Sequence, residues 1–250
     1  MSLADWAGLA ATSFAAALLQ AANGFGFAVL ATPFFLLFSE PGHAVQLVII
    51  ITLALSVVVL PGLHRAVHKP LLLRLALGSL VGLPLGLLAF DAADPVLVRG
   101  AAGIVILVFT AVLAANHLRR RGAVFALHPV GDLVTGAVSG FATALVGMAG
   151  PPVLIYLMLA GATPRAVRAT LLNFFALSYA ATLVAHVSTI GVPRATWIGA
   201  ASLVPFAWAG GLIGRTVADR LGNEAAAGLA ILVLAVAGLY TLAAAARAAI

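Results

Sequence analysis

Cysteine is absent from this 250-residue chain, and charged side chains are scarce. Without cysteine the chain can form no disulfide bond, no thiolate metal site and no cysteine nucleophile. Only 8% of the residues are Asp, Glu, Lys or Arg, whereas 64% are hydrophobic. So few polar side chains cannot cover the surface of a water-soluble globule. The composition therefore predicts an integral membrane protein with no soluble domain.

Motifs for catalysis and nucleotide binding are also missing. The sequence has no His-Glu-x-x-His zinc motif and no nucleotide-binding loop, and its seven acidic residues lie near the ends of apolar stretches rather than as a pair within one. Ser139 and His186 supply the residue types of a serine-protease dyad, but the flanking motif of such enzymes is absent. We therefore predict that the chain is not an enzyme, binds no cofactor or metal, and cannot by itself use ATP.

Apolar stretches close to the ~20 residues of a membrane span recur along the chain. They include residues 44–63, 71–90, 100–115, 167–187 and 225–246. The formal charge of +6 comes from the ends of such stretches, where it orients loops across the lipid bilayer and does not indicate nucleic acid as a partner. No Lys or Arg precedes Arg65, so the N-terminus lacks the basic region of a signal peptide and we expect its apolar segment to be retained. The predicted fold class is an all-α polytopic membrane protein of about eight membrane segments.

Two halves of the chain share one pattern, offset by about 122 to 123 positions. Matching residues are Gly24 and Gly147, Pro41 and Pro164, and Pro70 and Pro193. Chance matches are the alternative in a sequence rich in Ala, Leu and Gly, but the glycine of the break and the matching proline, Gly24 and Pro41 or Gly147 and Pro164, are 17 positions apart in both halves. We predict a first transmembrane repeat at residues 1–118, a basic cytoplasmic linker at 119–128 and a second repeat at 129–250.

Each predicted repeat opens with a segment that glycines interrupt, and three plain spans follow it. The interrupted segments are residues 3–22 plus 27–38 and residues 129–146 plus 151–161. The pieces after the breaks have 12 and 11 residues, too few to cross a bilayer. They are therefore predicted to be half-helices, which either continue a broken span or fold back as hairpins.

The distribution of positive charge favours hairpins. If each broken segment crosses once, Lys and Arg divide eight against five across the membrane, whereas hairpins divide them ten against three. Hairpins also give each half an odd number of crossings, which makes the halves inverted repeats. Inverted repeats with broken helices are a recurrent design of secondary transporters.

The breaks themselves are Asn23-Gly24-Phe25-Gly26-Phe27 and Gly147-Met148-Ala149-Gly150-Pro151-Pro152. Non-helical backbone is tolerated at membrane depth only where protein or a water-filled cavity surrounds it. Proline suits the first turn of a helix, and two half-helix N-termini brought together present free amides and partial positive charge, which favours an anion. The alternative is that these glycines only let helices pack closely.

Polar residues inside the spans are few, and they tend to face the interior of a bundle. Arg168 is the one cation placed about a turn inside a helix beside a break, and Gln46 is its counterpart in the first half. Its planar guanidinium suits an oxyanion, although a side chain that snorkels to the interface is the alternative. The predicted substrate-binding residues are Asn23, Gly24, Phe25, Gly26, Phe27, Gln46, Gly147, Met148, Gly150, Pro151, Arg168, Thr170 and Asn173.

The two breaks, with Pro33 after the first and with Arg168 and Asn173 after the second, resemble the TauE/SafE family of membrane proteins, also called the sulfite exporter or 4-toluene sulfonate uptake permease family. The similarity covers essentially the whole chain. It implies transport across the bacterial inner membrane of sulfur-containing anions such as sulfite, thiosulfate, sulfoacetate or other organosulfonates. The resemblance does not fix the substrate, the direction or the oligomeric state, and a homodimer is left open.

We therefore predict a secondary transporter that exposes a central anion site alternately to each side. An anion channel and a membrane assembly subunit without transport of its own are the alternatives. Asp132 and His186 are the titratable side chains within spans that proton coupling could use, and a place at the membrane interface is the alternative for both.

Overall fold

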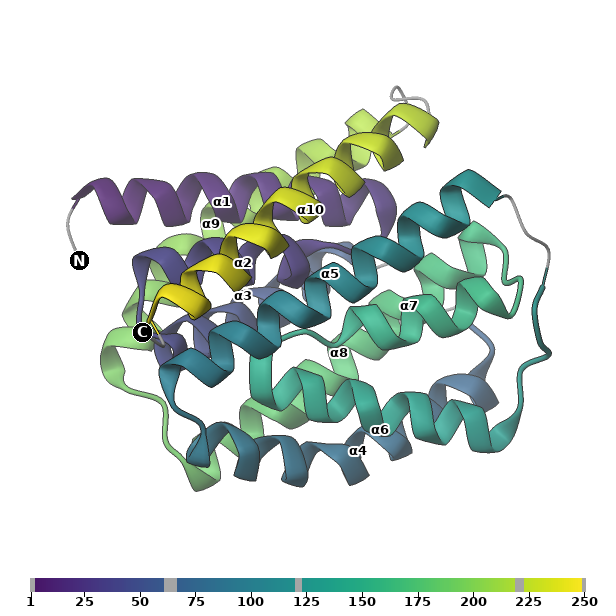
Figure 1. Ribbon diagram of the computed structural model, residues 1–250, viewed down its shortest axis with the longest axis horizontal. Helices are drawn as coiled ribbons and strands as arrows, with labels where there is room; N and C mark the ends of the chain where they lie inside the picture. Colours follow the sequence, from purple (N-terminus) through teal and green to yellow (C-terminus); the bar gives the residue numbers. More distant parts are fainter. Residues whose placement is uncertain (1–2, 61–66, 120–122, 219–222, 249–250) are drawn as a thin grey trace.

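The computed structural model describes residues 3–60, 67–119, 123–218 and 223–248. In these ranges the chain forms ten α-helices and no strand, which confirms the predicted fold class (Figure 1). The helices are α1 (Leu3–Asn23), α2 (Phe27–Phe38), α3 (Pro41–Val59), α4 (Lys69–Ala92), α5 (Pro95–Arg119), α6 (Pro129–Val146), α7 (Gly150–Leu159), α8 (Pro164–Thr189), α9 (Arg194–Ala218) and α10 (Asn223–Ala248).

Seven helices in the described ranges are long and apolar enough to cross a membrane: α3, α4, α5, α6, α8, α9 and α10. They include the three plain spans predicted for each half. The outward side of α4 shows why lipid must surround the bundle, because Leu73, Leu80, Leu85 and Leu88 are all exposed there. Such a face is costly in water and favourable in hydrocarbon.

Both glycine breaks reverse the direction of the chain. An ideal Cβ on Gly8, near the start of α1, would lie 2.8 Å from the Phe38 ring at the end of α2. A Cβ on Gly131, near the start of α6, would lie 2.8 Å from the Tyr156 hydroxyl in α7. The two helices of each broken segment are therefore antiparallel, as Figure 1 shows, and each segment is a hairpin, as the charge distribution predicts.

Divided at the link between α5 and α6, the chain has two sets of five helices that run in opposite directions. Figure 1 shows the C-terminal ends of α5, α7 and α9 at one end of the molecule, and the start of α1 and the end of α10 at the other. Lys69, Arg119 and Arg165 lie at helix ends on the first side, and Arg99 and Arg194 lie on the second. The arrangement is the inverted one that the odd number of crossings requires, while the repeat boundaries stay a prediction.

The first helix of each half packs mainly against a long helix of the other half. Helix α6 of the second half packs along α4 of the first, and α1 of the first half packs along α9 of the second. Figure 1 shows α4 beside α6 on one side of the bundle and α1 beside α9 on the other. Helices α5 and α10 complete this pseudo-symmetric set by packing against each other. Each hairpin therefore packs against a long helix of the opposite half, so neither half buries its own hairpin alone.

Glycines set the distance of these exchanged pairs. A Cβ on Gly82 or Gly86 of α4 would collide with the carbonyl of Ala137 or Phe141 in α6. In the other pair, Gly210 and Gly214 of α9 face the carbonyls of Phe14 and Leu18 in the same way. Positions 14 and 137, and positions 18 and 141, are each 123 apart in the sequence, so the two interfaces are equivalent. Small residues replace the hydrophobic effect as the means of bringing helices together in lipid.

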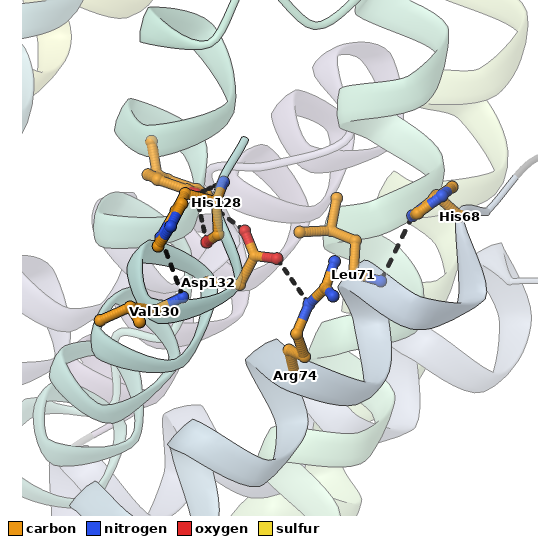
Figure 2. Close-up of polar contacts among 7 residues, drawn as sticks. His68, Leu71, Arg74, His128, Val130 and Asp132 are labelled. Atoms are coloured by element: carbon orange, nitrogen blue, oxygen red, sulfur yellow. Dashed lines mark hydrogen bonds and ion pairs between the residues drawn. The ribbon is translucent and has the colours of Figure 1, made fainter. Parts of the chain in front are cut away.

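An ion pair fastens the base of the second hairpin to α4. Arg74 Nε in α4 donates to Asp132 Oδ2 in α6 at 2.8 Å, and Figure 2 shows the two side chains pointing toward each other. The Tyr156 hydroxyl in α7 donates to Asp132 Oδ1 at 2.7 Å. Asp132 is fully buried, so its charge is compensated by two donors from two other helices. His68 and His128 cap the N-termini of α4 and α6 beside it (Figure 2).

Replacing Gly82 by alanine is expected to lower the free energy of unfolding by about 1–3 kcal/mol, because the added methyl group forces α4 and α6 apart. Thermal unfolding of the purified protein in detergent measures it. Gly100→Ala in α5 is the matched control, because no heavy atom lies within 4 Å of its Cβ position. An equal Tm for wild type and Gly82→Ala would contradict the close contact.

Candidate functional site

The first break is closed by a glutamine from the helix before it. Gly24 and Gly26 adopt φ values of +83° and +120°, which L side chains rarely reach. The amide of Phe27, the first residue of α2, donates to Gln20 Oε1 at 3.1 Å. Gln20 is buried, and its Nε2 has no hydrogen-bond partner. A buried amide nitrogen with two unused donors is costly unless something else binds it.

Arg168 of α8 lies directly on this break. A Cβ on Gly24 would lie 2.9 Å from Arg168 Cβ, so only glycine leaves room for the arginine. Arg168 Nη2 donates to the carbonyl of Ala21 at 2.8 Å, one of the last four carbonyls of α1, which the helix itself cannot pair. Its Nε is buried and has no partner. The guanidinium is therefore bound to the protein at the break through Nη2, while Nε remains a buried donor without a partner.

The second break is held by a tyrosine. Gly147 has a φ of +73° and ends α6 in the left-handed conformation. The Tyr179 hydroxyl of α8 donates to the Gly147 carbonyl at 2.9 Å and accepts from the Ala149 amide at 3.3 Å. Ser139 in α6 donates to the Ala149 carbonyl. Pro151 and Pro152 open α7 and lack amide hydrogens, so α7 offers fewer free donors than α2.

Both breaks line one small cavity. Its walls are Gln20, Phe25, Gly26, Ala28, Val29, Phe109, Gly150, Pro151, Phe175 and Tyr179. The N-terminal turns of α2 and α7 thus meet there, each with the partial positive charge of a helix start. The cavity volume is about 10 Å³, enough for about one water molecule. The structure is therefore closed at this point, and the cavity is too small for a sulfur oxyanion.

The structure places the other predicted residues as follows. Phe27 and Gly147 belong to the breaks but not to the cavity wall, and Met148 and Thr170 are buried in the core. Two further residues bind backbone carbonyls elsewhere: Gln46 Nε2 donates to Gly191 at 2.9 Å in the link after α8, and Asn173 Nδ2 donates to Ala169 in its own helix at 2.8 Å. The side chain of Asn23 lies outside the described residues.

Residues that the sequence did not single out complete the wall. Gln20 was visible as an intramembrane polar residue four positions before Gly24, which was the signal that could have marked it. Tyr179 lies 32 positions after Gly147, and no local pattern connects the two. The rings of Phe109 and Phe175 lie opposite Phe25 and Tyr179, with ring centroids 5.8 and 5.9 Å apart in edge-to-face contacts.

A profile of the family described as "Sulfite exporter TauE/SafE" matches residues 9–241. The chain belongs to this family. That confirms the resemblance seen in the glycine breaks, and it makes the protein a multi-pass membrane protein of a transporter family. No curated protein and no solved structure matches the chain.

Replacing Tyr179 by phenylalanine is expected to destabilise the protein by about 1–3 kcal/mol, because the buried Ala149 amide loses its partner. Thermal unfolding in detergent measures the loss, and hydrogen exchange at Ala149 locates it. Tyr240→Phe is the control, since Tyr240 is exposed on α10. If both variants unfold at the wild-type temperature, the tyrosine does not hold the break.

Proposed function

We propose that this protein is a secondary transporter of sulfur-containing anions, such as sulfite, thiosulfate or organosulfonates, in the bacterial inner membrane. The observation that carries the proposal is the meeting of two half-helix N-termini around one cavity, with buried unpaired donors beside the first of them. The family description supports a sulfur oxyanion as the substrate class.

The donors define how the anion is bound. Gln20 Nε2 and Arg168 Nε are buried nitrogens without partners, and both lie at the first break. Oxyanions accept several hydrogen bonds, and charge-assisted bonds are the strong ones. The first turn of α2 adds amides that no helical carbonyl can reach. The aromatic rings of Phe25, Phe109 and Phe175 form the apolar part of the wall, which suits the organic group of a sulfonate.

Alternating access follows from the exchanged packing. Each hairpin rests on the opposite half, so movement of α1 and α2 or of α6 and α7 opens the closed cavity toward one side or the other. The inverted orientation of the halves makes the two openings equivalent. Because no nucleotide-binding motif is present in the sequence, the energy comes from an ion gradient, the membrane potential or the substrate gradient.

Counterflow in proteoliposomes tests the proposal. Labelled sulfite outside is expected to exchange against unlabelled sulfite, thiosulfate or sulfoacetate inside, and not against chloride. A carrier gives exchange that saturates with concentration, whereas an anion channel gives conductance without counterflow. If folded protein exchanges none of these anions until a second protein is added, the assembly-subunit alternative holds instead.

Gln20→Glu is expected to abolish anion binding while the fold persists. The carboxylate still accepts the Phe27 amide, but it replaces the unpaired donors by a negative charge that repels the anion. Calorimetric titration with thiosulfate measures the affinity, and thermal unfolding reports the fold. Wild-type affinity in this variant would remove Gln20 from the site.

Arg168→Gln is expected to weaken binding about 10- to 100-fold, the range of a hydrogen bond to a charged group. Arg165→Gln is the matched control, because Arg165 lies three positions earlier on α8 with an exposed side chain. Equal affinity of both variants for thiosulfate would show that Arg168 does not bind the anion and only caps the end of α1 at Ala21.

A further inference from the structure

His186 of α8 is a buried titratable residue that the anion site does not use. It is fully buried, and its Nε2 lies 3.2 Å from the carbonyl of Ala144. A carbonyl can only accept, so Nε2 carries the hydrogen in the neutral ring. Nδ1 is then the basic nitrogen, and it is buried without a hydrogen-bond partner. The ring is held in the tautomer whose free lone pair can take up a proton.

The bond from His186 to Ala144 lies at the end of the helix that precedes the second break. Ala144 is one of the last four residues of α6, whose carbonyls lack helical partners, and the second break begins three positions later at Gly147. Arg168 makes the corresponding bond at the first break, where it donates to Ala21 near the end of α1. Two side chains of α8 therefore cap the helices that precede the two breaks. One is always charged, and the other is charged only when protonated.

Four helices pack against α8: α3, α4, α6 and α7. The titratable side chain of α3 is His43, which is bonded to Thr196 of α9. That of α7 is Tyr156, which is bonded to Asp132.

Helix α4 contributes Phe90, whose ring centroid lies 4.9 Å from that of His186, and α6 contributes the Ala144 carbonyl. On its own helix, Thr182 lies one turn earlier, and its Oγ1 is also buried without a partner. Beyond Phe90 a surface groove contains Glu40, Asp91 and Arg99. In the described chain no group of three metal-ligating side chains includes His186.

Asp132, the other titratable residue within a span, is bound differently. It is paired with Arg74 and Tyr156 at the opposite end of α6, so both of its oxygens are engaged. His186 has an unused base, and a proton taken up there adds a positive charge at the negative end of the α6 dipole.

We propose that His186 is the proton-binding residue that couples a proton to the anion in this transporter, a role that rests on the proposed transport function. A hydronium ion in the groove lined by Phe90 gives up one proton: its O–H bond breaks and leaves a neutral water molecule, an N–H bond forms at Nδ1, and the imidazole becomes imidazolium. The second break then carries a positive charge as the first does. The anion binds more tightly to that state, and by linkage the bound anion favours retention of the proton.

The size of the effect follows from the geometry of α8. Tyr179 contacts the second break, and His186 lies seven residues further on, about 10 Å at 1.5 Å per residue. A unit charge about 10 Å away, at an effective dielectric constant of about 20, changes the affinity for a divalent anion such as thiosulfate roughly a hundredfold. The attraction is present at low pH, when the ring is protonated, and is lost as the pH rises.

The first test is the affinity of the full-length protein in detergent for thiosulfate, whose charge is constant between about pH 5.5 and pH 8, the range over which histidine titrates. Wild type is expected to bind roughly a hundredfold more tightly at the lower pH, because thiosulfate carries two negative charges. His186→Gln keeps a neutral donor for the Ala144 carbonyl, and it is expected to bind equally at both values. His43→Gln is the control, because His43 is bonded to Thr196 in α9 and should leave the pH dependence unchanged. Persistence of the wild-type pH dependence in His186→Gln would overturn the proposal.

Transport gives the second measurement. With the membrane potential clamped at zero, a pH gradient is expected to drive net thiosulfate flux in wild type, and His186→Gln should abolish that flux while counterflow persists. Gradient-driven flux that survives in the variant contradicts the coupling role.

A readout that needs no substrate separates this inference from the proposed function. If thiosulfate neither binds nor exchanges, the proposed function fails for this anion. The ¹⁵N resonances of the His186 ring still show whether His186 takes up a proton. Titration of Nδ1 in wild type, with Nε2 protonated throughout, supports the proton site. A ring that stays neutral between about pH 5 and pH 8 overturns it.

Discussion

Close contact between glycine Cα atoms and the carbonyl oxygens of a facing helix is the constraint on which this structure depends. In lipid, apolar side chains gain nothing by leaving their solvent for a neighbouring helix, so association relies on packing at short range. Gly82 and Gly86 provide that contact for α4 and α6, and Gly210 and Gly214 provide it for α9 and α1. These pairs join the two halves, and they fix where each hairpin, and therefore each break, can lie.

Helix α8 then connects the hairpins to the chemistry of the site. Three of its side chains bind backbone at the ends of broken helices: Arg168 at the first break, and Tyr179 and His186 at the second. Glycine makes the breaks possible, but these contacts decide their shape. Because most of the polar groups at the breaks are already paired within the protein, the unpaired donors on Gln20 and Arg168 define where we propose that an anion binds.

Hydropathy and glycine spacing were enough to predict the helical class, the plain spans and the position of both breaks, since each depends on residues close in sequence. The hairpins followed from charge, which is also a local property. The exchange of partners between halves could not be predicted, because hydropathy does not say which apolar faces meet. The same limit explains Gln46: its place in the duplicated pattern suggested a site, whereas its side chain binds Gly191 in the link after α8. Tyr179 was missed because its partner is distant in sequence.

The pairing of α1 with α9 has a consequence for synthesis. Helix α1 is synthesised well before α9, and the hydrogen bond from Trp6 to Ser202 joins residues 196 positions apart. Until α9 is made, the face of α1 that packs against Gly210 and Gly214 has no partner. The first hairpin is then in the membrane with its break only partly enclosed. The enclosure of α1 is therefore a late step of folding, so a chain that terminates before α9 leaves α1 exposed to quality-control proteases.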